Sequence, residues 1–277
     1  QYNCISTARN NSLHHYQHNS KSFSTSTYMG FCSYGCSITS YGQPLKSINV
    51  TCNDVHFDNH SSDILLKAHA SPINPSDINI IEGKYALLPK SLPTICGNEG
   101  VFEVKKKGKA CSASSPKLGD FVIPSTALLG TWQQYLTVKE HDVIPLGVNL
   151  NDFEKYDQHL VAQLSMLAVN PCTAYRMIND FVRLDEQDWI VQNAANSAVG
   201  ECVIQIARNF GLKTINIIRG SAQGTDERSV EEFQIIREHL LALGADIVIG
   251  DQDLRKMDRE ERQKLIGKQP PKLGLNA

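Results

Sequence analysis

Residues 189–208 read WIVQNAANSAVGECVIQIAR, and this stretch decides the fold of the second half of the chain. It begins with a short apolar run typical of a buried strand and ends with apolar residues at helical spacing. The small residues in between let a backbone approach a phosphate, and the free N–H groups of a helix start bind anions. Gly200 is the only glycine of a GxGxxG pattern here, so a purely structural turn is the alternative.

The sequence on the C-terminal side continues this alternation of strands and helices. The pattern predicts strands at residues 189–192, 214–218, 246–249 and 272–276, and helices at 199–210, 230–243 and 255–267. Such alternation is typical of a parallel sheet with helical crossovers, the doubly wound plan. A complete dinucleotide fold has six strands, so we expect the sheet to be incomplete and the chain to be a fragment.

The sequence on the N-terminal side follows a different pattern. Short β-type runs occur at residues 64–68, 101–104 and 120–123, separated by loops that carry Pro and Gly. This pattern predicts an all-β or α+β domain over residues 41–165, followed by the α/β domain over residues 166–277.

Length and composition agree with two globular domains. The chain has 277 residues, of which 41% are hydrophobic and 20% are charged, with a net charge of -2. This nearly neutral balance disfavours a polybasic nucleic-acid binder. Residues 160–175 carry no charge, but this stretch is shorter than the roughly 20 apolar residues that span a bilayer, so we expect no membrane partner.

The first 40 residues have the composition of a targeting segment. No Asp or Glu precedes Asp54, and 13 of the first 41 residues are Ser or Thr. A stretch that is poor in acids, rich in Ser and without an apolar secretory core is typical of an organelle transit peptide. We therefore expect residues 1–40 to be a disordered mitochondrial transit peptide, with a merely disordered tail as the alternative.

The eight cysteines lack the tight spacing of a metal or redox motif. Cys32 and Cys36 come nearest, but no second Cys/His pair lies close in the sequence, which disfavours a zinc site. Free thiols in a reducing compartment are the expected state.

The end of the second predicted strand indicates which dinucleotide would bind. Ile218 is followed by Arg219, where NAD-binding units usually carry Asp or Glu for the ribose. Because an Arg offers several donors to a 2′-phosphate, we expect NADPH to bind here, with a solvated loop arginine as the alternative. Gly220 and Ser221 continue the turn, and Arg228 is a second candidate contact.

Four blocks, in this order and spacing, resemble the medium-chain dehydrogenase/reductase superfamily. They are NPSDIN at residues 74–79, GNEG at 97–100, NPCTAY at 170–175 and AANSAVG at 194–200. Within it, GKYALLP at residues 83–89 and LKTINIIR at 212–219 resemble the mitochondrial trans-2-enoyl-CoA reductase family. The resemblance implies a GroES-like catalytic domain over residues 41–165, a Rossmann domain over 166–277, a homodimer, and NADPH-dependent fatty acid synthesis in the mitochondrial matrix.

The resemblance also implies the site residues. Reduction of a 2-enoyl thioester requires a hydride at the β-carbon and a proton at the α-carbon, and Tyr85 would donate that proton. The substrate would be an enoyl-CoA or an enoyl-acyl carrier protein, and the sequence leaves open which. The expected cofactor contacts are Asn170, Asn196, Ser197, Ala198, Val199, Arg219, Gly220 and Ser221. Two positions depart from the family pattern: Ala198 stands where relatives often have Gly, and Ser221 where they place a second Arg.

We expect no catalytic zinc. Zinc alcohol dehydrogenases that resemble this chain read Gly-His-Glu where this one reads Gly97-Asn98-Glu99, and an amide is a poor substitute for an imidazole ligand. The stretch that corresponds to their structural zinc lobe offers only Cys111. A zinc-free NADPH:quinone reductase is the rival enzyme. The rival of another class is an inactive binding protein whose incomplete sheet has an unpaired edge.

Overall fold

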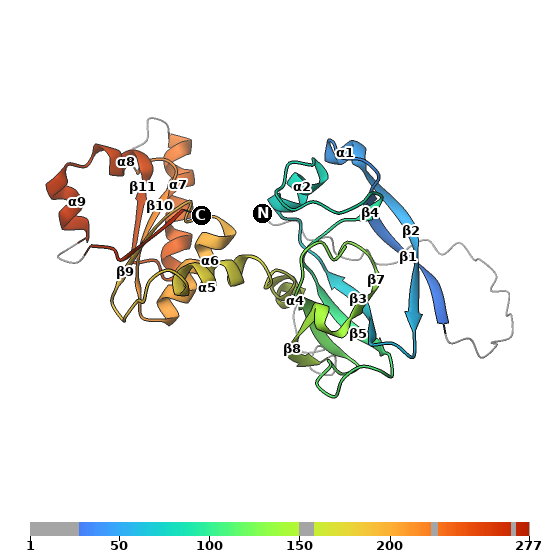
Figure 1. The fold of residues 1–277 in the computed structure, drawn as a ribbon. Coiled ribbons are helices and arrows are strands. Elements are labelled where there is room, and N and C mark those ends of the chain that lie inside the picture. Colours follow the sequence, from blue (N-terminus) through green and yellow to red (C-terminus); the bar gives the residue numbers. More distant parts are fainter. Residues whose placement is uncertain (1–27, 150–157, 223–226, 267–269, 277) are drawn as a thin grey trace. The chain divides into compact units, whose positions relative to one another are not determined.

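The computed structural model describes residues 28–149, 158–222, 227–266 and 270–276 (Figure 1). The chain divides into two compact units, Gln1–Ala168 and Val169–Ala277, close to the boundary expected after residue 165. No helix in the described ranges has both the length and the apolar character needed to cross a membrane.

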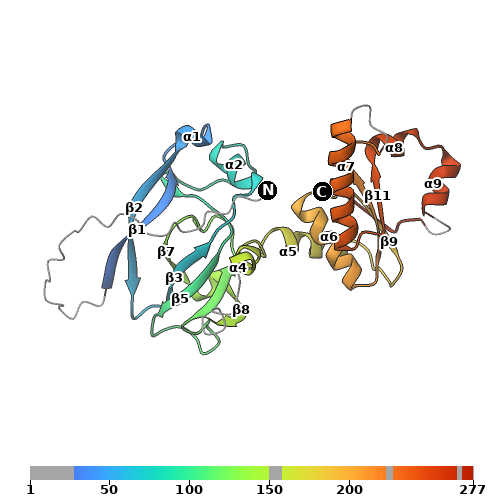
Figure 2. The same ribbon diagram turned by 180° about the vertical axis from the view of Figure 1, so that it is seen from behind.

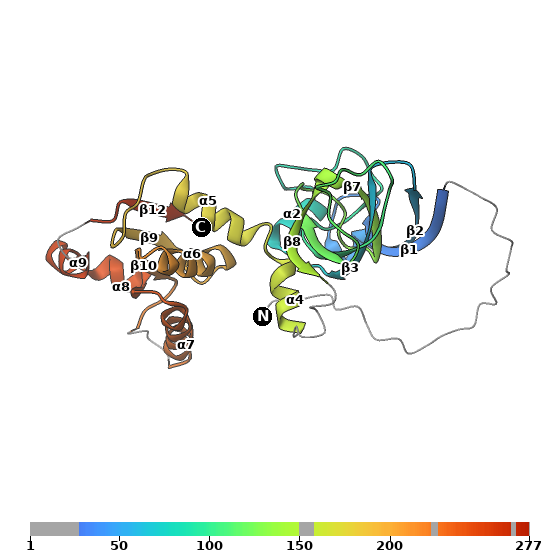
Figure 3. The ribbon, with the colours of Figure 1, turned by 90° about the horizontal axis from the view of Figure 1, so that it is seen from below.

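The first unit is built from antiparallel strands. A five-stranded sheet has the order β7-β3-β5-β6-β8 and curves strongly (Figure 3), and a three-stranded sheet has the order β2-β1-β4. The strands are β1 (Tyr28–Ile38), β2 (Ile48–Asp58), β3 (Asp63–Ala70), β4 (Thr94–Ile95), β5 (Val101–Lys107), β6 (Asp120–Pro124), β7 (Tyr135–Lys139) and β8 (Val143–Asn149). The helices are α1 (Pro44–Ser47), α2 (Pro75–Ile81), α4 (Gln158–Ser165) and a 3₁₀ turn at Glu140–Asp142. The predicted runs at residues 64–68, 101–104 and 120–123 are confirmed as β3, β5 and β6.

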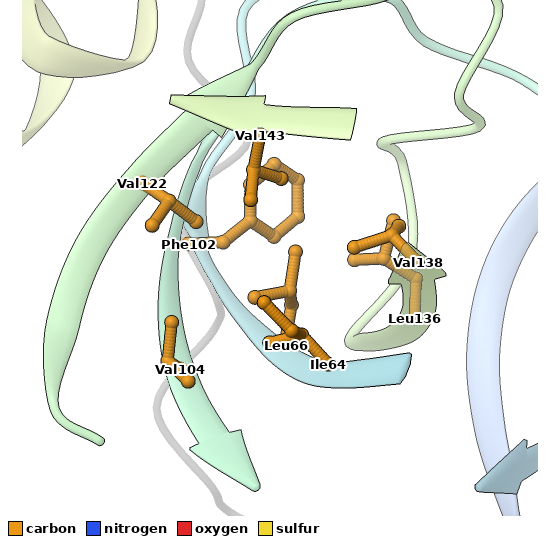
Figure 4. Packing of buried hydrophobic residues seen from close by; sticks show 8 residues of the cluster. All are labelled: Ile64, Leu66, Phe102, Val104, Val122, Leu136, Val138 and Val143. Carbon is orange, nitrogen blue, oxygen red and sulfur yellow. The ribbon is translucent and has the colours of Figure 1, made fainter. Parts of the chain in front are cut away.

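The core of this unit follows the two-residue period of its strands. Ile64 and Leu66 point inward from β3 and meet Phe102 of β5, as Figure 4 shows. Because side chains alternate along a strand, Leu65 lies on the other side and packs against β2. The buried cluster consists of Ile64, Leu66, Phe102, Val104, Val122, Leu136, Val138 and Val143.

The expectation of a disordered leader over residues 1–40 is wrong for its last part. Residues Tyr28–Ile38 form β1 and pair with β2 along their whole length. This strand also holds polar side chains at buried positions, which are tolerated when their polar groups find partners. The buried hydroxyl of Ser33 donates to Tyr135 O (3.1 Å) and accepts from Tyr135 N (2.9 Å). Residues 1–27 lie outside the described ranges, so the transit peptide stays a prediction for them.

The cysteines also differ in part from expectation. A disulfide joins Cys32 of β1 to Cys52 of β2, with Cα atoms 5.6 Å apart, so the prediction of free thiols is wrong for this pair. The disulfide depends on the antiparallel register of β1 and β2. This register places Cys32 opposite Asp54, two residues along β2 from Cys52, so the two cysteines are diagonal neighbours. The other cysteines of the described ranges, Cys36, Cys96, Cys111, Cys172 and Cys202, are not part of a disulfide. Burial raises the pKa of the Cys96 thiol to about 12, which disfavours a reactive thiolate there.

The second unit is a parallel sheet with the order β11-β10-β9-β12, as a doubly wound fold requires. The strands are β9 (Trp189–Asn193), β10 (Lys213–Ile218), β11 (Ile247–Gly250) and β12 (Leu273–Asn276). The helices are α5 (Asn170–Asn179), α6 (Ala198–Asn209), α7 (Glu227–Leu243), α8 (Asp251–Lys256) and α9 (Arg259–Ile266), and Figure 2 shows α6 and α7 beside the strands. Apolar clusters join α6 to α5 and to α7, and the predicted α/β plan is confirmed.

One predicted helix is divided into two. We expected a single helix over residues 255–267, but Met257 is extended, with ψ 136°, and separates α8 from α9. Asp258 starts the second helix because its carboxylate accepts from Glu261 N (2.8 Å), while Glu261 accepts from Asp258 N (2.9 Å). This reciprocal capping box stabilises a new helix start more than continuation of the old one.

The turn from β9 to α6 is held at unusually short range. A Cβ on Gly200 would lie 2.6 Å from the Ala195 carbonyl oxygen, so only glycine allows this approach. The fully buried Gln192 donates through Nε2 to Gly200 O (3.0 Å) and to Asn216 Oδ1 (2.8 Å). These contacts fix the first turn of α6 against β9 and β10.

Phe102→Ala should destabilise the first unit by about 3–5 kcal/mol, because it removes a fully buried ring from the centre of the cluster. The chain has two Trp residues, so Trp132 fluorescence in a Trp189→Phe background follows this unit during urea unfolding. Leu45→Ala is the control, since Leu45 is 101% exposed. Equal midpoints for the two variants would contradict the assigned core.

Gly200→Ala should destabilise the second unit by about 1–3 kcal/mol, because the added methyl overlaps the Ala195 carbonyl. Trp189 fluorescence in a Trp132→Phe background measures it. Gly274→Ala is the matched control: its Cβ would meet Val191 Cγ1 at 3.8 Å, an ordinary contact. We expect that control to change stability by less than about 1 kcal/mol. A Gly200 variant as stable as the control would refute the close approach.

Candidate functional site

A cavity of about 990 Å³ opens where β9, β10 and β11 end. Ligands of doubly wound folds bind at this carboxyl edge of the sheet. The wall is formed by the ends of these strands together with α7 and α8. Its lining residues are Asn193, Ala194, Asn196, Ile217, Ile218, Arg219, Gly220, Ser221, Ser229, Glu232, Phe233, Ile236, Asp251, Gln252 and Arg255.

The β9–α6 turn supplies the part of this cleft suited to an anion. Ala194 has a positive φ of 45°, which turns the chain sharply after β9. Ser197 caps α6, and its Oγ accepts from Gly200 N at 3.1 Å. Ala198 and Val199 form the first turn, whose N–H groups have no acceptor within the helix. Free N–H groups and small side chains are the features that bind a phosphate.

The β10–α7 turn carries the cation expected from the sequence. Arg219 is exposed and lines the cleft. Gly220, at φ 111°, donates its N–H to Asp251 Oδ1 (2.9 Å). The hydroxyl of Ser221 donates to one oxygen of Asp253, whose other oxygen accepts from Ala222 N (2.8 Å). Ser221 therefore shapes this turn through Asp253.

Sequence reasoning missed the two carboxylates that hold this turn. Asp251 and Asp253 start α8, directly after β11. Their signal was a pair of acids just past the third strand of a parallel sheet, because the carboxyl ends of neighbouring strands lie together.

The candidate second cation, Arg228, does not line the cleft. Its Nε lies 3.1 Å from Glu232 Oε1, one helical turn away on α7, and Glu232 is the lining residue of the two. In the described ranges, the Arg219 guanidinium has neither a hydrogen bond nor an ion pair.

The predicted cofactor contacts fall into three groups. Asn196, Arg219, Gly220 and Ser221 line the cleft, and Ser197, Ala198 and Val199 form the helix start next to Asn196. Asn170 begins α5 and is not a lining residue.

Tyr85 belongs to the first unit, in the loop after α2. Its side chain is 42% exposed, and Leu87 beside it is also exposed. Gly83 has a φ of 72°, and its Cβ position lies 3.0 Å from the Tyr41 ring. Tyr41 also donates through its hydroxyl to Pro89 O (3.5 Å). Tyr41 thus supports both ends of a loop that presents a phenol and an apolar side chain to solvent.

The GNEG block contributes hydrogen bonds to the interior of the first unit. Asn98 donates through Nδ2 to Asp77 Oδ1 (2.9 Å) and accepts at Oδ1 from Leu128 N (2.7 Å). Asn74 donates to the buried Glu99 Oε2 (2.7 Å). Burial raises the pKa of the Asp77 carboxyl, although hydrogen bonds from Asn74 and Asn98 act in the opposite direction. Both polar atoms of the Asn98 amide therefore have partners within the protein.

Comparison with known proteins identifies the first unit by a family model and relates most of the chain to known enzymes. Residues 60–148 match the family model of the alcohol dehydrogenase GroES-like domain. The mitochondrial enoyl-[acyl-carrier-protein] reductase of Rattus norvegicus is 40% identical over 233 residues, which cover 84% of this chain and 54% of that protein. The chain thus spans about half the length of the curated relatives it matches.

Two solved structures extend the similarity to the fold. The mitochondrial 2-enoyl thioester reductase Etr1p/Etr2p heterodimer of Candida tropicalis has a TM-score of 0.73 at 30% identity, covering 89% of this chain and 69% of that one. The complex of Etr1p with NADP and crotonyl-CoA has a TM-score of 0.72 at 30% identity, with the same coverage. A GroES-like unit, a Rossmann unit and this level of identity place the chain in the mitochondrial enoyl thioester reductase family of the medium-chain dehydrogenase/reductases.

Proposed function

We propose that this chain serves the NADPH-dependent reduction of trans-2-enoyl thioesters to saturated acyl thioesters in mitochondrial fatty acid synthesis. The observation that carries the proposal is the cleft at the carboxyl edge of the Rossmann sheet, where the exposed Arg219 is available to a phosphate. The complex of the related Etr1p contains NADP and a 2-enoyl thioester, which supports the same pair of ligands here. The acyl group would be carried by CoA or by an acyl carrier protein.

The residues of the cleft fit NADPH. A volume of about 990 Å³ accommodates a dinucleotide portion, and the turn of small residues allows a pyrophosphate to approach the backbone. Asn196 and the first turn of α6, Ser197 to Val199, would hold the pyrophosphate. Arg219 and the Gly220–Ser221 turn would hold the adenosine ribose and its 2′-phosphate, with Asn170 as a contact from α5. When bound, NADPH supplies the hydride for the β-carbon of the substrate.

Tyr85 supplies the proton in this proposal. Hydride addition to the β-carbon leaves negative charge on the enolate, and a positioned phenol can protonate the α-carbon. The same loop exposes both Tyr85 and the apolar Leu87, which suits an acyl chain. Both polar atoms of the Asn98 amide are engaged within the protein, by Asp77 and by Leu128, and an amide is a poor zinc ligand. A zinc-free mechanism therefore relies on Tyr85 for proton delivery.

We also propose the mitochondrial matrix as the location and a homodimer as the assembly. The curated relatives are named as mitochondrial proteins, and Etr1p forms a heterodimer with Etr2p. Residues 1–27 carry the acid-poor, Ser-rich composition of a transit peptide, and their removal would leave β1 intact.

Arg219→Ala should selectively weaken NADPH binding, because the 2′-phosphate loses a charge-assisted contact worth roughly 1.5–3 kcal/mol. Fluorescence titration with NADPH and NADH measures both affinities. Arg228→Ala is the matched control, an exposed arginine of the same region that does not line the cleft. Equal losses for the two cofactors in the Arg219 variant would assign that residue a structural role.

Tyr85→Phe should lower kcat for a trans-2-enoyl-CoA by about 10²–10⁴-fold and leave KM little changed, because only the proton donor is lost. The assay follows NADPH absorbance, with the 277-residue chain and with the longest product of its gene. Tyr41→Phe is the control, since it alters a hydroxyl that supports the same loop. Near-normal kcat in the Tyr85→Phe enzyme would remove Tyr85 from the mechanism. If the protein were a quinone reductase, the Tyr85→Phe variant would still reduce a quinone, because that reaction needs no phenol.

A further inference from the structure

The cleft holds more negative charge than a single arginine can offset. Among its described lining residues, Glu232 and Asp251 are acids, and Arg219 and Arg255 are the cations. A 2′-phosphate carries up to two negative charges and would be repelled by both carboxylates. Selective binding of NADPH therefore requires a second cation besides Arg219.

Another arginine of this region, Arg228 of α7, is excluded by its position, because it does not line the cleft. The remaining described cation of the wall is Arg255.

Arg255 stands on a helix that is fixed to the Arg219 turn. Gly220 N donates to Asp251 Oδ1 (2.9 Å), and Gln252 N donates to Gly220 O (3.3 Å). A Cβ on Gly250 would lie 2.3 Å from Gly220 O, which shows how closely the two segments approach. The start of α8 and the turn after β10 thus form one continuous wall of the cavity.

The guanidinium of Arg255 is available for a ligand. Its partner among the described residues is Asp251, with Nη2 3.3 Å from Oδ2, and the Arg255 side chain is 80% exposed. Exposed pairs of this kind on one helix are weak and are easily exchanged for a stronger anion. Asp251 stays in place when Arg255 moves, because its other oxygen accepts from Gly220 N.

We propose that Arg255 is the second contact of the NADPH 2′-phosphate and, with Arg219, determines cofactor specificity. The inference rests on the proposed use of NADPH. It assigns the second cation of this site to α8. Asp251 then has two tasks: it holds the turn through Gly220 and keeps Arg255 at the rim until the phosphate replaces it.

The test is a set of fluorescence titrations of the 277-residue chain with NADPH and with NADH. Arg255→Gln should raise the Kd for NADPH by about 5–20-fold, since an exposed charge-assisted contact is lost, and change the Kd for NADH less than about twofold. Lys256→Gln, one residue further on α8 and outside the cleft lining, should change neither. Asp251→Asn keeps an acceptor for Gly220 N but removes a carboxylate, and should lower the Kd for NADPH by about 2–5-fold.

The outcomes separate this inference from the proposed function. Equal effects of Arg255→Gln on both cofactors, or no effect on either, overturn the role of Arg255. If the unmodified chain prefers NADPH and Arg219→Ala removes that preference, the proposed cofactor stands even when Arg255→Gln has no effect. If the unmodified chain binds neither cofactor, or both equally, the cofactor assignment fails and the role of Arg255 fails with it. Circular dichroism confirms that each variant is folded.

Discussion

The contact between the β9–α6 turn and the strands beneath it is the constraint on which the Rossmann unit depends. Gly200 lets the first turn of α6 lie against Ala195, and the Gln192 amide joins Gly200 to Asn216 of the next strand. Both bonds are made by the buried Nε2 of Gln192, so its N–H groups have acceptors within the unit. The same contact fixes where the N–H groups of α6 begin, and so where a phosphate can bind. The close approach of Gly200 to Ala195 thus determines both the packing of α6 on the sheet and the position proposed for the phosphate.

The second turn of the cleft is shaped by charge instead of by close packing. Asp251 and Asp253 hold Gly220, Ser221 and Ala222 through backbone and hydroxyl groups. This leaves Arg219 unpaired in the described part of the chain, in a cleft that is also lined by Arg255, which is held by an exposed pair. Carboxylates so close to a phosphate site are unfavourable for binding unless cations outnumber them locally. In the proposed site, the balance of four side chains, Arg219, Arg255, Glu232 and Asp251, would set the preference between the two dinucleotides.

The β-rich unit holds the loop of Tyr85, the proposed proton donor, on a sheet with a compact core. Tyr41 supports the Tyr85 loop at Gly83 and at Pro89. Asn98 connects α2, through Asp77, to the segment at Leu128. Asn98 thus serves as a hydrogen-bonded bridge between these two segments.

The sequence by itself determined the features that depend on local spacing. The strand, turn and helix of residues 189–208, the parallel α/β plan and the position of Arg219 after a strand could be read from residues a few positions apart. The division between α8 and α9 carried a local signal too, the Asp258–Glu261 capping box, which we overlooked. Only the tertiary structure decided that Ser33 completes a strand, that Cys32 joins Cys52, and that Asp251 holds Gly220. These partners lie 20 to 102 positions apart, and they meet because strand register and the common edge of a parallel sheet bring distant residues together.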